Sequence, residues 1–328
     1  MTYPANHLSL VADVGGTNTR VALADGTQVL KDTVRRYAND DHDSLSDVLR
    51  RYIAEEDEVD CKAACVAMAG PVRDGVAHLT NRGWSMDKET LAEIARAERT
   101  AILNDLQAQG HALGHLPQTG TELILPSEHP AGDQAAKLVI GIGTGFNIAP
   151  VYMTEPQRLV TPSEAGHALL PLRSARDLQL AEMLAQDHGV AAVEDVLSGR
   201  GLEALYRFCA HEAGAPATRA SRDIVDAFRD DTDPLARQAA EGFARFMGLV
   251  AGNLALNHLP FGGIYFAGGM ARAFAPHLHE LGFEAAFRDK GRFSDFMGQF
   301  AIHMIADDYA ALTGCAAHLD GLATAPRG

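Results

Sequence analysis

Three glycine-rich turns, each behind a predicted apolar strand, are the first residues of this sequence that could carry chemistry. They are Asp13-Val-Gly-Gly-Thr-Asn-Thr-Arg20, Gly141-Ile-Gly-Thr-Gly145 and Ala267-Gly-Gly269. Glycine lets backbone N–H groups approach a phosphate closely, and threonine adds a hydroxyl donor. One such turn is weak evidence, because tight hairpins also need glycine, but three of them point to a bound nucleotide.

Other nucleotide and hydrolase motifs do not occur in the sequence. There is no Gly-x-x-x-x-Gly-Lys-Ser/Thr, which excludes a P-loop enzyme, and Phe146 stands where a dinucleotide fingerprint needs its third glycine. Neither Gly-x-Ser-x-Gly nor His-Glu-x-x-His is present. We therefore interpret the glycine turns as phosphate loops of another type.

Carboxylates end two of the predicted strands. Asp13 precedes the first glycine turn and could hold Mg2+ through water beside a phosphate, although it could also serve only to form the turn. Asn104-Asp105 follows a predicted strand at residues 100–103. Asp105 could accept the proton of an attacking alcohol while Asn104 binds a neighbouring hydroxyl, or the pair could cap the following helix. Local sequence does not decide between these two interpretations.

A further polar group lies in the predicted loop Ser163-Glu-Ala-Gly-His167. Glu164 and His167 suit the hydroxyls of a polyol, and they make a poor zinc set because no third ligand is evident. Glu194 could offer another acceptor, although taken alone it is more typical of an exposed helix carboxylate.

Elements that would position these residues follow from hydrophobic periodicity. Strands are predicted at residues 8–14, 20–24 and 29–37 with hairpin-like turns, which imply antiparallel pairing. A helix from Ser44, a strand at 64–69, a short helix after Asp87 and the strand at 100–103 come next. The pattern then begins again with strands at residues 138–142 and 146–152.

Residues 10–15 and 138–143 align apolar with apolar and glycine with glycine, which is a weak internal repeat. It suggests two similar halves around a cleft. The second half is largely helical, with helices predicted at residues 175–186, 202–211, 224–228, 234–257 and 309–319, and strands at 263–267 and 302–306. Glycines 242, 248 and 252 would weaken an isolated helix, so we expect them to allow close helix packing.

Composition limits the class of protein. The 328 residues suit two domains, and the 47% of hydrophobic residues is enough for real cores. A formal net charge of -15 argues against a nucleic-acid partner. Four cysteines without metal-like or disulfide-like grouping, no signal-like start and no apolar run of ~18 residues lead us to expect a cytoplasmic protein without a membrane partner.

Taken together, the motifs resemble those of the bacterial glucokinase family, within the actin-like ATPase and sugar-kinase superfamily, over nearly the whole chain. Residues 13–20 and 143–145 are similar to its two phosphate motifs, 103–105 to its catalytic segment, and 164–167 and 194–199 to its sugar-binding segments. Further family-like stretches are found at residues 252–257, 261–263, 267–269 and 286–293.

The resemblance implies an α/β fold, the two-domain actin-like (ribonuclease H-like) sugar-kinase fold with a hexose cleft between the domains. The small domain would comprise residues 1–112 plus 305–328, and the large domain 113–304. It also implies a homodimer, ATP, Mg2+ and glucose. The sugar would be bound by Asn104, Asp105, Glu164, His167 and Glu194. The nucleotide side would comprise Asp13, Gly15, Gly16, Thr17, Asn18, Gly143, Thr144, Gly145, Gly268 and Gly269.

The implied reaction is transfer of the γ-phosphate of Mg-ATP to the 6-hydroxyl of glucose, with Asp105 as general base and Asp13 holding Mg2+ through water. Alternatives are a kinase for another hexose and a non-catalytic sugar sensor on the same fold. The sensor would need a DNA-binding helix pair before the first motif, where about seven residues precede the first strand. An actin-like structural protein would give no reason for Glu164 and His167.

Three positions depart from the family pattern. Asn147 replaces a usual glycine after the second phosphate turn, which could narrow the nucleotide site or alter ATP affinity. Ser163 and Ala165 replace glycines around Glu164, but they are small enough for the loop to keep its path. The related repressor-and-kinase group has a cysteine-rich zinc motif after its Glu-x-x-His segment. Because no cysteine follows His167 before Cys209, we expect no structural zinc.

Overall fold

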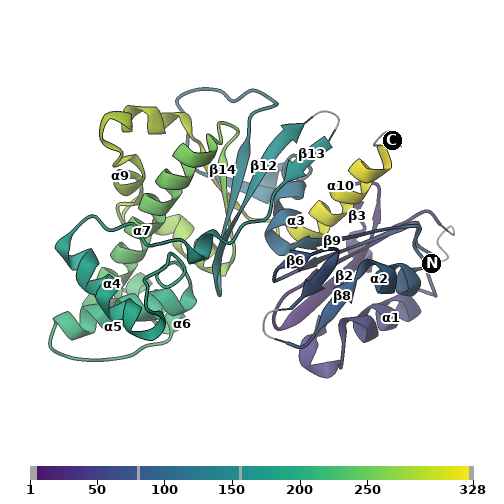
Figure 1. Cartoon of the computed structure of the whole chain (residues 1–328), viewed down its shortest axis with the longest axis horizontal. Coiled ribbons are helices and arrows are strands. Elements are labelled where there is room, and N and C mark those ends of the chain that lie inside the picture. Colours follow the sequence, from purple (N-terminus) through teal and green to yellow (C-terminus); the bar gives the residue numbers. More distant parts are fainter. Residues whose placement is uncertain (1–5, 80–81, 155–156, 325–328) are drawn as a thin grey trace. The chain divides into compact units, whose positions relative to one another are not determined.

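The computed structural model describes residues 6–79, 82–154 and 157–324 (Figure 1). In this part of the chain, no helix is both long and apolar enough to cross a membrane.

The chain forms two compact units, each with its own sheet and core. Unit 1 comprises Met1–Gly120, Met153–Pro162 and Asp307–Gly328. Unit 2 comprises Thr121–Tyr152 and Ser163–Ala306.

The main sheet of unit 1 combines a hairpin with parallel strands. Its order is β3 (Gln28–Val29), β2 (Asn18–Asp25), β1 (Ser9–Val14), β5 (Ala63–Met68) and β9 (Arg99–Asn104), with β4 (Arg35–Ala38) also paired to β2. β1 is antiparallel to β2 and parallel to β5, which is parallel to β9. The carboxyl ends of β1, β5 and β9 therefore share one edge, where open α/β sheets bind their ligands.

The strand predicted at residues 29–37 is wrong in its middle. Between β3 and β4 the chain forms a 3-10 turn at Lys31–Thr33. Thr33 is buried, and its hydroxyl accepts a hydrogen bond from Leu23 N at 2.9 Å and donates one to Leu30 O at 2.7 Å. A side chain thus satisfies a backbone donor of β2 that a continuous strand would have used.

Alternating side chains of β1 divide the core of unit 1 between the two faces of the sheet. Leu10, Ala12 and Val14 pack with α1 (Leu45–Glu55) and α2 (Lys88–Ala95), whereas Val11 packs with α10 (Ala310–Thr324). A small sheet that the sequence did not indicate completes this unit, with strands β6 (Val72–Arg73), β7 (Val76–His78) and β8 (Ser85–Asp87).

Two helices of unit 1 pack unusually closely. α10 lies against α3 (Asp105–Ala112), and a Cβ on Gly314 would come within 1.7 Å of Ala108 O. No side chain larger than hydrogen fits there, so glycine is required for this contact. β13 (Gln157–Val160) contacts α3 as well, and Gln107 Nε2 donates to Val160 O at 3.0 Å.

The sheet of unit 2 repeats the hairpin arrangement. Its strands run in the order β10 (Thr121–Leu125), β15 (Ile302–Ile305), β14 (Ile264–Ala267), β11 (Lys137–Ile142) and β12 (Phe146–Thr154). β11 is antiparallel to β12 and parallel to β14, as β1 is antiparallel to β2 and parallel to β5. The predicted repeat between residues 10–15 and 138–143 thus falls on equivalent hairpins.

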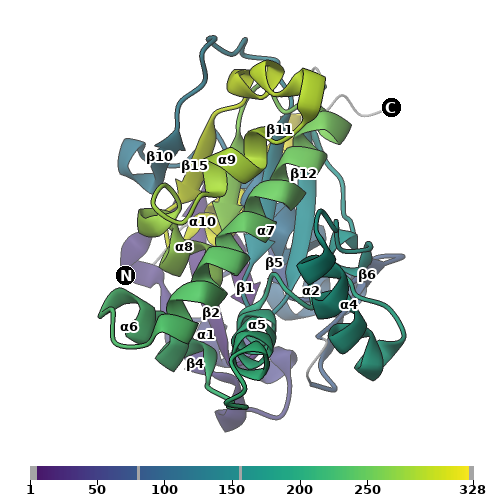
Figure 2. The same ribbon diagram turned by 90° about the vertical axis from the view of Figure 1, so that its left-hand side faces the viewer.

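The longest helix of unit 2 is α7 (Pro234–His258). The others are α4 (Ala175–His188), α5 (Gly199–Glu212), α6 (Ser221–Arg229), α8 (Gly269–Phe274) and α9 (Phe283–Arg288). Figure 2 shows α9 beside one end of α7, and α5 and α6 beside the other. Added Cβ atoms on Gly248 and Gly252 would meet Phe283 O at 2.5 Å and Phe287 O at 2.6 Å, which confirms that these glycines permit close packing. Gly242 makes only ordinary contact with Leu205.

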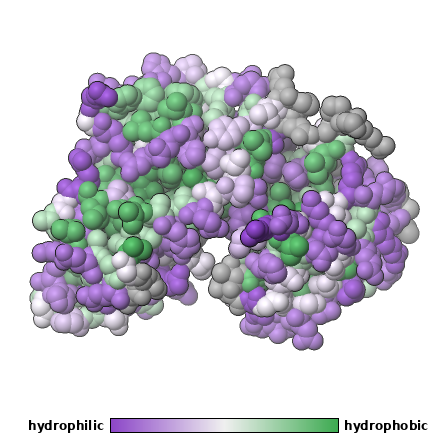
Figure 3. Space-filling model, viewed as in Figure 1, coloured by the Kyte–Doolittle hydropathy of each residue, from purple (hydrophilic) through white to green (hydrophobic). Residues whose placement is uncertain are grey.

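Apolar side chains, green in Figure 3, gather over the part of unit 2 where α4 lies in Figure 1. Large exposed apolar residues in or next to α4 are Leu169, Leu172, Leu178 and Val190.

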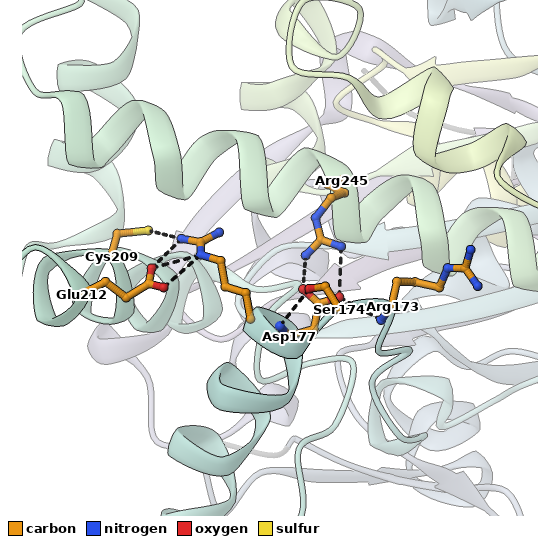
Figure 4. A network of polar contacts seen from close by, with 7 residues as sticks. Arg173, Ser174, Asp177, Cys209, Glu212 and Arg245 are labelled. Atoms are coloured by element: carbon orange, nitrogen blue, oxygen red, sulfur yellow. Dashed lines mark hydrogen bonds and ion pairs between the residues drawn. The ribbon is translucent and has the colours of Figure 1, made fainter.

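A polar network connects α4 with α5 and α7 (Figure 4). Asp177, whose side chain is 3% exposed, binds Arg245 through two hydrogen bonds of 2.5 and 3.2 Å. It also accepts a bond from Arg173 N at 2.8 Å. Burial raises the pKa of Asp177, but the bonds from Arg245 and the Arg173 backbone outweigh burial and hold that pKa below its usual range. Beside it, the more exposed Glu212 pairs with Arg176 at 2.8 Å.

We predict that Asp177→Asn lowers the unfolding midpoint by about 5–10 °C at pH 7, because it removes the counter-charge of the partly buried Arg245 and disrupts a buried hydrogen-bond network. Glu212→Gln, which breaks the more exposed pair, should shift it by roughly 2 °C or less. Thermal unfolding followed by circular dichroism measures both. Since the folded pKa of Asp177 is depressed, the difference should be fully present above the ordinary Asp pKa of about 3.9 and be lost as the pH falls from there through the lower folded pKa. Equal shifts for the two variants would contradict the assignment.

Candidate active site

The two carboxylates singled out in unit 1 lie at one edge of its sheet. Asp13 is the penultimate residue of β1, and Asp105 directly follows the last residue of β9. Both strands are parallel to β5, which lies between them, with Asp13 opposite Ala67 and Asn104 opposite Met68. The structure therefore brings Asp13 and Asp105 together.

Asn104 caps α3, so the capping interpretation of this pair is confirmed. Its Oδ1 accepts a hydrogen bond from Leu106 N at 2.9 Å, and Gln107 Oε1 accepts one from Asn104 N at 3.1 Å. Its Nδ2 donates to Gly70 O at 3.0 Å. These bonds fix the first turn of α3, whose first residue is Asp105. Capping thus holds Asp105 in place and leaves open its use as a base.

The electrostatic environment makes Asp105 a weaker acid than usual. Burial, together with the nearby charge of Asp13, raises the pKa of Asp105 to about 6. Burial also raises the pKa of Asp13, although Arg20, whose Nη1 lies 3.5 Å from Asp13 Oδ2, partly offsets it. A carboxylate with a pKa near the working pH is suited to accept a proton during a reaction.

Asn39 is a residue that the sequence motifs do not include, and it holds the first glycine turn. Its buried side chain donates from Nδ2 to Gly15 O at 2.8 Å and accepts from Thr19 Oγ1 at 2.8 Å, while its backbone N donates to Thr17 O at 2.9 Å. No motif marks Asn39, because it lies in a 3-10 turn more than twenty residues after Gly15. Gly16 and Thr17 remain exposed, whereas Asn18 Oδ1 accepts a bond from Arg36.

The second and third glycine turns come together in unit 2. β11 and β14 are parallel neighbours, so Gly143 and Gly268 follow strands that end at the same edge. Gly268 has φ +96°, and a Cβ on it would lie 2.4 Å from Ile142 O. A Cβ on Gly143 would lie 3.9 Å from Gly269 N. Thr144 is exposed at the tip of the second turn.

The loop that carries Glu164 and His167 presses against the start of β12. Residues Ala165–His167 form a 3-10 turn, and a Cβ on Gly166 would come within 2.2 Å of Phe146 O. Glu164 and His167 are exposed, and His167 N donates to Glu164 O at 3.1 Å.

Glu194 joins the second glycine turn to this loop. Its Oε2 accepts a hydrogen bond from Phe146 N at 2.8 Å, and its backbone N donates to Gly166 O at 2.9 Å. A Cβ on Gly145 would lie 2.5 Å from Glu194 Oε2. Glu194 lies in a turn with 23% of its side chain exposed, so the interpretation as an exposed helix carboxylate is wrong.

The side chain of Asn147 bonds to the loop of Glu164 and to its own strand, and not to the glycine turn that precedes it. Its side chain lies against the loop of Glu164, with Nδ2 3.3 Å from Glu164 Oε2. The glycine turn before it is closed instead by Gly143 N donating to Gly145 O at 2.9 Å.

Asp13 offers a single carboxylate beside the first glycine turn. Within the described ranges, no three His, Cys, Asp or Glu side chains gather in a way that could hold a metal ion. Mg2+ in nucleotide enzymes commonly keeps several waters and binds one or two protein carboxylates together with substrate phosphates. The donor at Asp13 therefore fits a Mg2+ that arrives with the nucleotide.

The sequence of the chain also matches a known protein family. The glucokinase family model matches residues 10–322. The chain belongs to the glucokinase family. A glucokinase of Erwinia tasmaniensis is 34% identical over 317 residues, which cover 95% of this chain and 96% of that protein. The family resemblance inferred from the motifs is thereby confirmed.

Solved structures agree with this family membership. The crystal structure of a glucokinase from an Antarctic psychrotroph matches with a TM-score of 0.82 and 28% identity, covering 95% of this chain and 98% of that one. A glucokinase from Balamuthia mandrillaris, solved in complex with glucose, matches with a TM-score of 0.77 and 22% identity, covering 94% and 92%. The predicted actin-like sugar-kinase fold class is confirmed.

We predict that Gly166→Ala lowers the unfolding midpoint by about 3–10 °C, since its Cβ would collide with the Phe146 carbonyl, which cannot move without disturbing β12. Gly145→Ala should cost less, because the Glu194 carboxylate that it meets can rotate away. Gly269→Ala, with no atom within 4 Å of its Cβ, is the matched control. Differential scanning fluorimetry ranks the three. If Gly166→Ala behaved like the control, the close packing of this loop would be refuted.

Proposed function

We propose that this protein is an ATP-dependent glucokinase that transfers the γ-phosphate of ATP to the 6-hydroxyl of glucose. The observation that carries the proposal is Asp105, held at the first turn of α3 with a pKa of about 6 in a chain of the glucokinase family. Sugar turnover by such an enzyme requires a base at this position with a pKa below working pH.

In the proposed mechanism Asp105 accepts the proton of the 6-hydroxyl as its oxygen forms a bond to the γ-phosphorus. The bond between that phosphorus and the oxygen of the departing ADP breaks, so the products are glucose 6-phosphate, ADP and a proton on Asp105. Asn104 Nδ2 uses one hydrogen for Gly70 O and has a second for a neighbouring sugar hydroxyl.

Residues of unit 2 supply the rest of the proposed binding set. Exposed Glu164 and His167, together with Glu194, bind sugar hydroxyls. Backbone N–H groups of residues 143–145 and 268–269, like those of residues 15–18 in unit 1, bind the phosphates. Mg2+, held through water by Asp13, would supply positive charge for the phosphoryl oxygens when it binds with ATP.

Asp105→Ala tests the base. We expect kcat to fall by about 10²–10⁴-fold, while glucose still binds because the other polar contacts remain. A coupled ADP-release assay measures turnover, and calorimetry without ATP measures glucose binding. Asp74→Ala, at an exposed turn, is the control. Near-normal turnover of the Asp105 variant would sink the assigned role.

The pH profile tests the environment of that base. Because protonated Asp105 cannot accept a proton, kcat should fall about tenfold per pH unit below about pH 6 and level off above it. Asp13→Asn removes the neighbouring charge that raises the pKa of Asp105, so the acid limb should move to lower pH whatever activity remains. If the acid limb did not move in this variant, it would not arise from the interaction between Asp13 and Asp105.

Substrate choice is tested with the same assay across glucose, mannose, fructose, glucosamine and N-acetylglucosamine. Preferential turnover of glucose supports the proposal, and turnover of another sugar keeps the mechanism but changes the substrate. Sugar-dependent thermal stabilisation without turnover would favour a non-catalytic sensor.

A cytoplasmic location and a homodimer, both expected from the sequence, remain part of this proposal. The exposed apolar residues in and next to α4 are compatible with a surface that a second copy covers. Light scattering of the purified protein measures the subunit number.

A further inference from the structure

Asn147, the second residue of β12, makes three side-chain hydrogen bonds toward the sugar loop and its own strand. Its Oδ1 accepts bonds from Ile148 N at 2.9 Å and Ala165 N at 3.2 Å. Its Nδ2 donates to Glu164 Oε2 at 3.3 Å. The side chain therefore links the start of β12 to Glu164 and Ala165 of the sugar loop.

The orientation of this amide follows from its partners. Two backbone N–H groups converge on one atom of the side chain, and only the amide oxygen can accept from them. The NH2 group must then face Glu164, whose carboxylate can accept but, when ionised, cannot donate. The three contacts are mutually consistent in this orientation alone.

This contact determines what Glu164 can do. Glu164 is exposed and its side chain has several rotatable bonds, so an unsupported carboxylate would lose conformational freedom on binding a ligand. With Oε2 engaged by Asn147, the carboxylate is already oriented and Oε1 can accept from a hydroxyl. Glycine at position 147 could supply neither the donor nor the acceptor.

The nucleotide turn, in contrast, is supported by a different side chain. Glu194 Oε2 binds Phe146 N and lies where a Cβ on Gly145 would be, and Gly143 N closes the turn on Gly145 O. None of the three side-chain bonds of Asn147 goes to residues 143–145.

We propose that Asn147 is a positioning residue for the sugar, which orients the Glu164 carboxylate so that one oxygen accepts from a glucose hydroxyl. This inference rests on the proposed glucokinase function and adds a residue that determines sugar affinity. It assigns Asn147, which replaces a glycine usual in the family, to the sugar side of the site instead of the nucleotide side.

Two variants separate the parts of this role. Asn147→Ala removes the donor and the acceptor. Asn147→Asp keeps an oxygen for Ile148 N and Ala165 N but places a second carboxylate against Glu164. If the side chain only braced the loop backbone, Asn147→Asp would behave like wild type. If it orients Glu164, both variants should raise the glucose KM by about tenfold or more, with kcat within about threefold and the ATP KM within about twofold.

A pH signature distinguishes orientation of Glu164 from a general loss of structure. Two adjacent carboxylates raise each other's pKa, so at lower pH the pair shares a proton and regains a hydrogen-bond donor. The loss of glucose affinity in Asn147→Asp should therefore shrink between pH 8 and pH 5.5, whereas the loss in Asn147→Ala should not. Calorimetric titration of D-glucose without ATP measures this independently of the ionisation of Asp105 during turnover.

Tyr152→Phe is the matched control, because it removes a hydrogen bond of about 3.3 Å to His258 from the same strand. It should leave the glucose KM unchanged. A raised ATP KM with unchanged glucose binding in the Asn147 variants would overturn the inference and return position 147 to the nucleotide turn. If the wild type phosphorylates glucose and both Asn147 variants keep its glucose KM, this inference alone is contradicted. If the wild type neither binds nor phosphorylates any hexose, the proposed function is contradicted as well.

Discussion

Two carboxylates that repel each other, Asp13 and Asp105, are the constraint around which unit 1 is organised. Partial burial and mutual repulsion both favour protonation, and a base is useful only if it can lose its proton near neutral pH. The sheet keeps them together because β1 and β9 flank β5 in parallel. Arg20 on β2 offsets part of the charge of Asp13, and the cap of α3 offsets part of that of Asp105. The core beneath these strands is what prevents the pair from separating.

In unit 2, the main requirement is to hold exposed glycine turns in a defined shape. Backbone alone does not define such turns, since glycine loses more conformational freedom on ordering than any other residue. Here a carboxylate, Glu194, braces the second turn, as the amide of Asn39 braces the first in unit 1. Both are polar side chains supplied from a distant part of the sequence. The turns therefore owe their shape to hydrogen bonds that cross between elements.

Much of this arrangement was predictable because it depends on local patterns. Strand ends followed by glycine or carboxylate are visible in the sequence, and so is the repeat of the two hairpins. Partners remote in sequence were not visible. Nothing near Asn147 indicates that its amide meets Glu164, and nothing near Asn39 indicates that it binds Gly15. The break at Thr33 was missed for the same reason, since a hydroxyl that bonds a neighbouring strand leaves no periodic signal.

The close contact of α10 with α3 has a consequence for biosynthesis. The helix that begins with Asp105 packs on Gly314, yet the whole of unit 2 is encoded between them. As the chain leaves the ribosome, α3 of unit 1 is made first, but α10 can dock on it only after unit 2 has been synthesised. During that interval the α3 side of the sheet is without its cover, so a nascent or truncated chain would expose apolar surface to chaperones and proteases.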